Sequence, residues 1–178
     1  MAWTADSLDS GPGGIIKDNP ALLASWRFQF AARPGYHAPM SIPRFHLAFP
    51  VRDLAEARAF YGGLLGCSEG RSSDDWVDFD FYGHQIVAHL APGEVARAAA
   101  SPVDGHDVPV RHFGAILEPA AWAALAERLS AAGTQFIIEP NVRFPGQPGE
   151  QSTMFFLDPS GNALEFKAFA DDAMVFAK

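Results

Sequence analysis

The hydrophobic and polar positions of the chain form one order of elements that occurs twice beyond residue 41. The first copy opens with PRFHLAFPV, where apolar side chains alternate with others and His46 lies opposite the apolar face of a predicted strand. Apolar side chains then recur at helical spacing, and Asp53 is the candidate N-cap of that helix. Two further alternating runs predict a hairpin on which Asp78 and Asp80 face solvent.

The second copy follows the same order, so that each copy is a strand, a helix and then two or three antiparallel strands. VRHFGAIL predicts a strand that carries His112, 66 residues after His46. A helix with proline at its start follows, then a strand, the Gly- and Pro-rich loop NVRFPGQPGEQ and a hairpin that turns at DPSGN. In the last strand Leu164 and Phe166 make the apolar face, so Glu165 lies on the other face.

Two copies of a βαβββ unit predict an α+β fold. The helix of each unit covers one face of its sheet, so the two remaining faces can pair into an open, cupped mixed sheet around a cleft. The predicted modules span about residues 43–95 and 108–169, within a domain of residues 41–178. The ligand candidates of the two copies then point into the cleft.

The first 40 residues have no sustained period and contain DSGPGG, which predicts an irregular N-terminal arm or one short helix. The segment lacks the basic start and the continuous apolar centre of a secretory signal. A second interpretation places the natural start at Met40 and makes the arm an upstream extension.

The composition is that of a folded, soluble protein, with 48% hydrophobic and 19% charged residues. A net charge of −8 argues against nucleic-acid binding, because phosphates attract clustered lysine and arginine. The sequence contains no apolar run long enough to cross a membrane. Cys67 is the only cysteine and cannot form an internal disulfide, so we expect the protein in the cytoplasm.

Two imidazoles and one carboxylate from three strands form a good ligand set for a divalent transition metal. Each of His46, His112 and Glu165 also has an ordinary interpretation, as a satisfied core histidine or a solvent-facing glutamate. The equivalent places of the two histidines in the two copies favour the metal site. Three protein ligands would leave coordination positions open for water or substrate.

Three segments resemble the vicinal-oxygen-chelate superfamily of glyoxalase I, extradiol dioxygenases, and fosfomycin and bleomycin resistance proteins. They are RFHLAFPVRDLAEARAFYGGLLG, VRHFGAIL and FFLDPSGNALEF, and the resemblance covers about residues 43–169. It implies paired βαβββ modules, a metal held by His46, His112 and Glu165, and assembly as a homodimer. It also implies oxidoreductase or lyase chemistry on a small molecule.

The chain departs from two members of the family that it resembles. Glyoxalase I takes a fourth ligand from the last strand of the first module, where this chain has Val87, with His89 two residues on. The three-ligand set therefore looks more like the extradiol dioxygenases, which favours Fe(II) or Mn(II) and leaves zinc or nickel as alternatives. Those enzymes place a tyrosine and a histidine where this chain has Phe155 and Glu150.

We therefore predict a metal-dependent, dioxygenase-like enzyme that binds a small oxygen-rich substrate by bidentate chelation. The catalytic candidates are His89 and Glu150, and the substrate-binding candidates are Arg143, Gln151 and Phe155. The alternatives are a glyoxalase-type lyase or isomerase, and a non-catalytic protein that sequesters an antibiotic in the same cleft.

Overall fold

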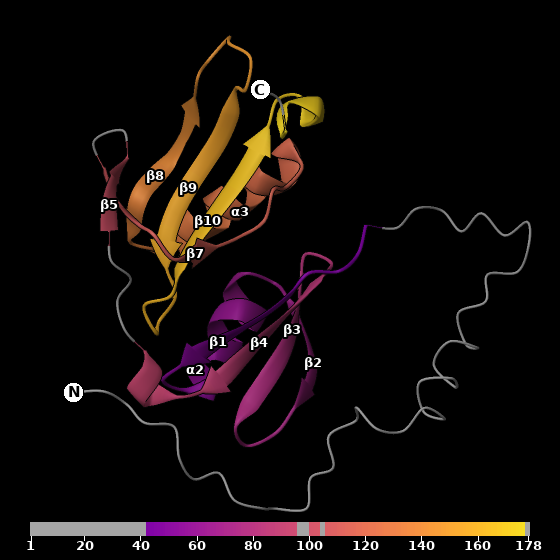
Figure 1. Ribbon diagram of the computed structural model, residues 1–178, viewed down its shortest axis with the longest axis vertical. Coiled ribbons are helices and arrows are strands. Elements are labelled where there is room, and N and C mark those ends of the chain that lie inside the picture. The colour runs from indigo at the N-terminus through magenta and orange to yellow at the C-terminus, as the bar shows by residue number, and fades with distance from the viewer. Residues whose placement is uncertain (1–41, 96–99, 104–105, 177–178) are drawn as a thin grey trace, which may run out of the picture. The chain divides into compact units, whose positions relative to one another are not determined.

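Two four-stranded mixed sheets carry the fold, and each corresponds to one copy of the repeated pattern (Figure 1). The computed structural model describes residues 42–95, 100–103 and 106–176, so the predicted arm of residues 1–40 lies outside the described residues. Within the described part, no helix is long and apolar enough to cross a membrane. The prediction of an α+β fold built from two βαβββ modules is confirmed.

The first strand of the first module runs parallel to its last strand, and a helical segment follows the first strand. Asp53 caps this helix as predicted, because its carboxylate accepts the backbone N–H of Glu56 at 2.8 Å. Beyond Ala57 the backbone continues as a wider π-helical turn. The elements are β1 (His46–Val51), α2 (Leu54–Ala57), η2 (Arg58–Leu64), β2 (Ser68–Ser72), β3 (Trp76–Phe81) and β4 (His84–Leu90), in the sheet order β1-β4-β3-β2.

The second module repeats this order around a helix that buries Trp122, Leu125 and Leu129. Its first long strand extends farther than predicted, because Arg143 still pairs with Gln151 of the next strand. A short hairpin that the hydrophobic pattern did not predict, β5 (Ala100–Val103) and β6 (His106–Pro109), precedes the module. The module comprises β7 (His112–Phe113), α3 (Pro119–Ala131), β8 (Phe136–Arg143), β9 (Gln151–Leu157) and β10 (Ala163–Phe169), in the order β7-β10-β9-β8.

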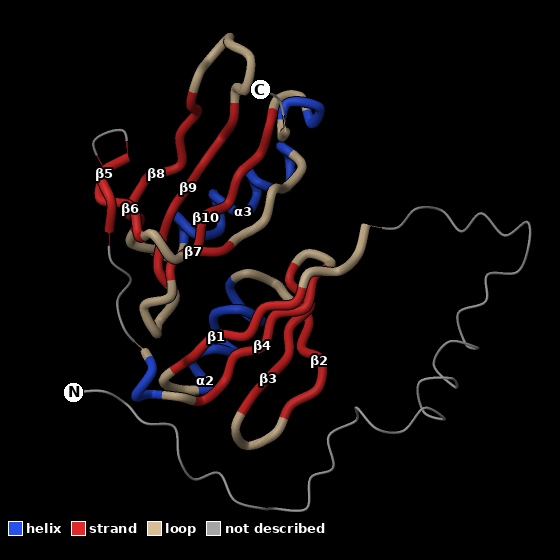
Figure 2. Tube along the Cα trace, viewed as in Figure 1, coloured by secondary structure: helices blue, strands red, loops and turns tan. Residues whose placement is uncertain are grey.

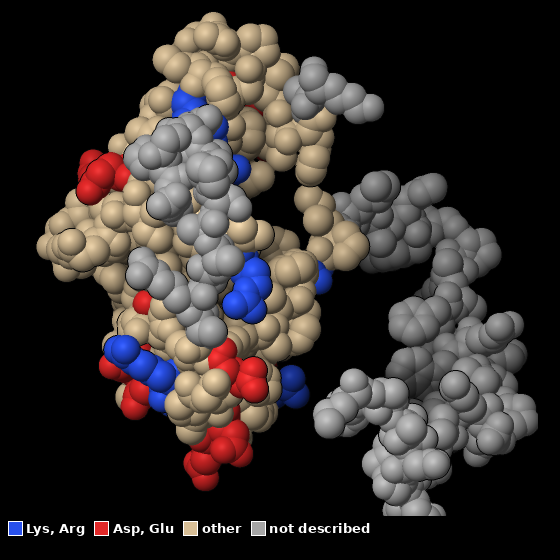
Figure 3. All heavy atoms as spheres, turned by 60° about the vertical axis from the view of Figure 1, so that its left-hand side comes forward, with Lys and Arg blue, Asp and Glu red and all other residues tan. Residues whose placement is uncertain are grey.

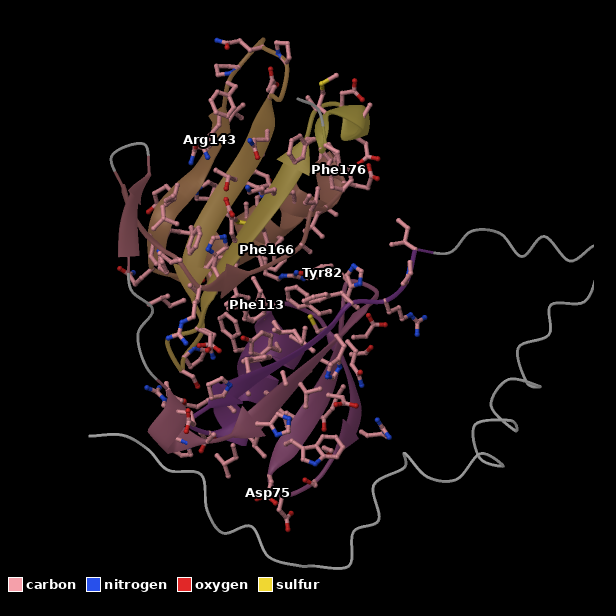
Figure 4. All side chains as sticks on the ribbon, in the orientation of Figure 1. Asp75, Tyr82, Phe113, Arg143, Phe166 and Phe176 are labelled. Atoms are coloured by element: carbon pink, nitrogen blue, oxygen red, sulfur yellow. The ribbon has the colours of Figure 1, made fainter. Side chains whose placement is uncertain are left out.

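The helix-facing sides of the two sheets join in one hydrophobic core. Rings from both modules meet there, and the centroids of Phe81 and Phe166 are 5.6 Å apart. Figure 2 shows a helix against one side of each sheet, and Figure 4 shows Tyr82 and Phe113 close to Phe166 at this junction. The face of each sheet that carries the predicted ligands therefore lies opposite the shared core.

The DPSGN turn of the second module docks into the first module. The buried Asp158 carboxylate accepts hydrogen bonds from the Tyr61 hydroxyl and from the backbone and side chain of Asn162. The Asn162 amide also donates to the carbonyl oxygen of Pro50 at 2.9 Å. A segment that the sequence predicts as a turn therefore also fastens the two modules together.

Candidate functional site

Two of the predicted metal ligands, His112 and Glu165, lie side by side on the second module. β7 runs parallel to β10, and the imidazole Nε2 of His112 is 3.4 Å from the carboxylate Oε2 of Glu165. Gly114 permits this approach, because a β-carbon there would overlap the carbonyl oxygen of Glu165. The segment VRHFGAIL thus contributes to the site through its glycine as well as its histidine.

The hydrogen bond of His112 determines which ring nitrogen carries the hydrogen when the imidazole is neutral. Its Nδ1 lies 2.8 Å from the backbone carbonyl oxygen of Pro109, which only accepts hydrogen bonds. In the neutral ring Nδ1 therefore carries the hydrogen, and Nε2 presents a lone pair to the carboxylate. Two cis ligands of an octahedral ion at about 2.1 Å are about 3 Å apart, so the observed pair fits a divalent metal.

Neighbouring side chains fix the carboxylate of Glu165. The Thr153 hydroxyl donates to Oε1 at 3.0 Å, and the Lys167 ammonium lies 3.4 Å from the same oxygen. These contacts leave Oε2 turned toward His112. The buried ring of Phe155 meets the imidazole edge to face, with centroids 4.9 Å apart. The two predicted ligands are thereby held in one orientation against an apolar wall.

The third predicted ligand, His46, lies on the outer face of the first module. Its Nδ1 is 2.8 Å from the side-chain oxygen of Gln85, which is its partner residue on β4. Among the residues that the structure describes, no three His, Cys, Asp or Glu side chains gather closely enough to hold a metal. The chain therefore brings His112 and Glu165 together without His46.

A pocket of about 530 Å³ opens on the second module beside His112 and Glu165. The strand register orders its floor in rows, because residues opposite one another on paired strands share a face. Glu165 and Phe155 form one row of this floor, whereas Arg143, which also lines the pocket, is paired with Gln151, which does not line it. The walls also include Val108, Ile138, Asn141 and Phe144.

The three predicted substrate-binding residues, Arg143, Gln151 and Phe155, belong to this sheet face. The guanidinium of Arg143 lies 5.0 Å from the centroid of the Phe144 ring. The side-chain oxygen of Gln151 is buried and has no hydrogen-bond partner among the described residues. Two cationic side chains, Arg143 on β8 and Lys167 on β10, line the pocket, and Lys167 is paired with Glu165. Acidic side chains instead gather at the lower end of the molecule in Figure 3. Figure 4 shows Asp75, in the turn between β2 and β3 of the first module, at the same end.

The two predicted catalytic residues do not line this pocket. Glu150 ends the loop after β8, and its carboxylate accepts the backbone N–H of Gly146, so it holds the loop. His89 is exposed on the outer face of the first module. His89 and Lys167 occupy corresponding positions, since each lies four residues beyond the partner of its module's first-strand histidine.

Asp78, which the sequence pattern assigns to solvent, is buried on the same face as His46. Its side chain is 8% exposed, accepts a hydrogen bond from the Gln85 amide at 3.0 Å and lies 3.6 Å from Nε of Arg71. The prediction for Asp78 is wrong because these neighbours cover it, whereas Asp80 is exposed as predicted.

Four polar residues that support the predicted ligands were not assigned that role from the sequence: Asp78, Gln85, Thr153 and Lys167. Each shares a sheet face with the predicted ligand near which it lies, so strand alternation was the available signal. Alternation alone does not say which residues of neighbouring strands stand opposite one another. The register shifts between β8 and β9 show why that pairing is hard to infer.

Cys67 is buried and does not belong to the site. Burial, reinforced by Asp80 and opposed by Arg128, raises the pKa of its thiol to about 12. The thiolate, not the thiol, is the nucleophile, so Cys67 is unreactive at neutral pH.

Comparisons with known proteins place this geometry in a family. The family model described as Glyoxalase/Bleomycin resistance protein/Dioxygenase superfamily matches residues 45–166. A glyoxalase/bleomycin resistance protein/dioxygenase from Alicyclobacillus acidocaldarius is 35% identical, with a TM-score of 0.62 over 79% of this chain and 100% of that chain. No curated protein sequence matches the chain.

Two more distant solved structures show the same fold. The genomically encoded fosfomycin resistance protein FosX from Listeria monocytogenes is 18% identical, with a TM-score of 0.56 over 76% of this chain and 98% of that chain. A glyoxalase/dioxygenase from Nostoc punctiforme is 16% identical, with a TM-score of 0.55 over 79% of this chain and 100% of that chain. At these identities the similarity extends to the fold alone.

Proposed function

The chain belongs to the glyoxalase/bleomycin resistance protein/dioxygenase superfamily, and we propose that it is a metal-dependent enzyme that binds a small oxygen-rich substrate by bidentate chelation. The observation that carries this proposal is the pairing of His112 Nε2 with Glu165 Oε2 at 3.4 Å. The Pro109 carbonyl supports a metal-binding lone pair on the imidazole, and Thr153 and Lys167 turn the carboxylate toward it.

We propose His46 as the third ligand, contributed by a second copy of the chain. Within one chain the two ligand-bearing faces lie opposite a shared core, and His46 is not gathered with His112 and Glu165. A homodimer in which the first module of one copy faces the second module of the other would complete the set, as symmetric dimers commonly allow. The ligands would then be two imidazoles and one carboxylate.

The proposed ligand set favours Fe(II) or Mn(II), with zinc or nickel as alternatives, because it combines nitrogen and oxygen donors and leaves positions open. When bound, the metal would polarise two oxygens of the substrate. Arg143 and Lys167 line the pocket and would attract an acidic or enolate oxygen of the same molecule. The buried oxygen of Gln151 would accept a hydrogen bond from a substrate hydroxyl or amine.

We propose His89 of the second copy as the acid–base residue of this reaction. It is exposed on the face of the first module that would close over the pocket, in the position that corresponds to Lys167. An imidazole has one ring nitrogen that can accept a proton and one that can donate it, as an acid–base residue requires. Glu150 is the weaker candidate, since its carboxylate is engaged by the backbone of its own loop.

Metal analysis of protein purified without added metal tests the proposal. We expect about one metal ion per chain in the wild type, and its loss in His112→Ala, because structural and catalytic ions depend on each ligand. His89→Ala is the matched control, since it removes an imidazole that is not a proposed ligand and should retain the metal.

The identity of the metal separates the branches of the proposal. Iron or manganese would support the dioxygenase-like chemistry, which oxygen uptake with a panel of catechols then tests. Nickel or zinc would favour the lyase or isomerase branch. Absence of metal under every loading condition would overturn the proposal and leave sequestration of a small molecule as the function to test.

A further inference from the structure

We propose that Gln85 and Asp78 are positioning residues that hold His46 as the tautomer able to bind a metal through Nε2. The inference deepens the proposed function and rests on its assignment of His46 as a ligand. It concerns the imidazole before any metal is bound, so it has a test of its own.

The three residues form a hydrogen-bonded row across three neighbouring strands of the first sheet. His46 is on β1, Gln85 on β4 and Asp78 on β3. Nδ1 of His46 lies 2.8 Å from Oε1 of Gln85, and Nε2 of Gln85 lies 3.0 Å from Oδ2 of Asp78. Arg71 on β2 extends the row, with its Nε 3.6 Å from the same oxygen.

The chemistry of the groups fixes the direction of each hydrogen bond. A carboxylate only accepts, so the amide nitrogen of Gln85 must face Asp78, and the amide oxygen must then face His46. An amide oxygen also only accepts, so the hydrogen of the neutral imidazole must reside on Nδ1. Nε2 of His46 is left with its lone pair, which is the form that coordinates a metal.

The burial of Asp78 favours this role over a purely structural one. A carboxylate that is 8% exposed loses hydration, a cost that proteins accept where the charge has a partner or a task. Asp78 lies on the sheet face opposite the hydrophobic core, so packing of that core does not account for its burial.

The second module supports the same interpretation with different atoms. There the Pro109 carbonyl oxygen, and not a glutamine, accepts from Nδ1 of His112. The two histidines come from corresponding strands, and both are therefore held with Nδ1 protonated and Nε2 available. Unrelated acceptors that impose one tautomer on two proposed ligands indicate that this tautomer is required.

Long-range ¹H–¹⁵N correlation spectra of histidine-labelled protein, recorded without metal at a pH where the imidazoles are neutral, test the inference. We expect His46 to be the Nδ1–H tautomer in the wild type. In Gln85→Leu and Gln85→Met the acceptor is removed, so both tautomers should appear. His112 is the internal control, because its acceptor is a backbone carbonyl and its tautomer should not change in any variant.

A double variant separates positioning from general disruption. Asp78→Asn combined with Gln85→Glu exchanges the amide and the carboxylate, so residue 85 again accepts from Nδ1 while residue 78 donates. We expect the Nδ1–H tautomer of His46 to predominate in this double variant, unlike in Gln85→Leu and Gln85→Met. Three results would overturn the inference: wild-type His46 with its hydrogen on Nε2, an unchanged His46 tautomer in both single variants, or a double variant with an intact His112 signal that does not recover.

Titration with Mn(II) alone supplies the second readout. Loss of an outer hydrogen-bond partner typically weakens metal binding about 10- to 100-fold, and we expect this for Gln85→Leu with recovery in the double variant. Wild-type protein that shows the expected tautomer but binds no metal would contradict the proposed function and leave the tautomer inference standing. Wild-type protein that binds the metal although its His46 carries the hydrogen on Nε2 would contradict the tautomer inference and leave the proposed function standing.

Discussion

The hydroxyl of Tyr61 donates a 2.9 Å hydrogen bond to the carboxylate of Asp158, and both side chains are buried although 97 residues separate them in the chain. Tyr61 belongs to the helical segment of the first module, and Asp158 to the DPSGN turn of the second. Burial raises the pKa of both groups, which indicates how little water reaches them. The bond is therefore a buried polar contact between the modules.

Tyr61→Phe should lower the free energy of unfolding by about 1.5–3 kcal/mol, because it removes a buried hydrogen bond to an acidic group while keeping the ring. Urea denaturation measures this loss. Tyr82→Phe is the matched control, since the Tyr82 hydroxyl donates to the Leu65 carbonyl within the first module and is partly exposed. A loss in Tyr61→Phe no larger than in the control would contradict the role of the contact in joining the modules.

The stability of the protein should also depend on the protonation of Asp158. Burial raises the pKa of this carboxyl above its ordinary 3.8, although hydrogen bonds from Asn162 and Tyr61 act in the opposite direction. A group whose pKa is raised in the folded state binds its proton more tightly there, so its contribution falls as pH rises through the folded pKa.

The sign of this effect can be measured as a difference between two proteins. The free energy of unfolding of the wild type, minus that of Asp158→Asn, should decrease as pH rises from below 3.8 to above the folded pKa and then level off. Urea denaturation at a series of pH values gives both curves. A difference that grows with pH would mean that the folded protein stabilises the ionised carboxylate.

Gly114→Ala should disturb the proposed metal site through the backbone. The added methyl group would overlap the carbonyl oxygen of Glu165, so β7 and β10 must separate or tilt. We expect a loss of about 1–3 kcal/mol of stability, as for other overpacked substitutions, together with weaker metal binding. Gly63→Ala is the control, because nothing lies within 4 Å of its β-carbon position and its stability should hold. Unchanged metal affinity in Gly114→Ala would contradict the close approach.

Mixing two variants that each lack one proposed metal ligand tests whether His46 and His112 of one site come from different copies. His46→Ala and His112→Ala should each lose the metal when refolded alone. Refolded together in equal amounts, they should regain about one quarter of the wild-type metal content, because half of the dimers are mixed and each mixed dimer has one complete site. Recovery of no metal would place both histidines of a site in the same chain and reject the proposed exchange between copies.

The alternation along the strands was enough to predict most of the fold. It placed His46 and Glu165 on the faces opposite the core, and the N-cap at Asp53 and the helix beginning at Pro119 also appear in the structure. These features depend on residues close together in the sequence, where hydrophobic period and capping chemistry act directly.

The environment of the site was much harder to predict, because it depends on which residues of different strands meet. Asp78 is buried by Arg71 and Gln85, which come from the two neighbouring strands. Nothing in the local pattern of DDWVDFDF distinguishes Asp78 from Asp80, which remains exposed. The sequence likewise could not show that the two sheet faces with the predicted ligands would lie opposite a shared core.

The shared core between the two modules has a consequence for how copies associate. In the proposed assembly each chain has two unlike half-sites, one with His46 and one with His112 and Glu165. Every complete site then joins the first kind of half-site from one copy to the second kind from another. Such contacts either close into a ring or continue as an open filament, and only a closed ring leaves no half-site unfilled. The ratio of bound metal to chains would therefore show whether the assembly is closed. It reaches one in a closed dimer and stays below one in an open filament, whose two ends each have an unfilled half-site.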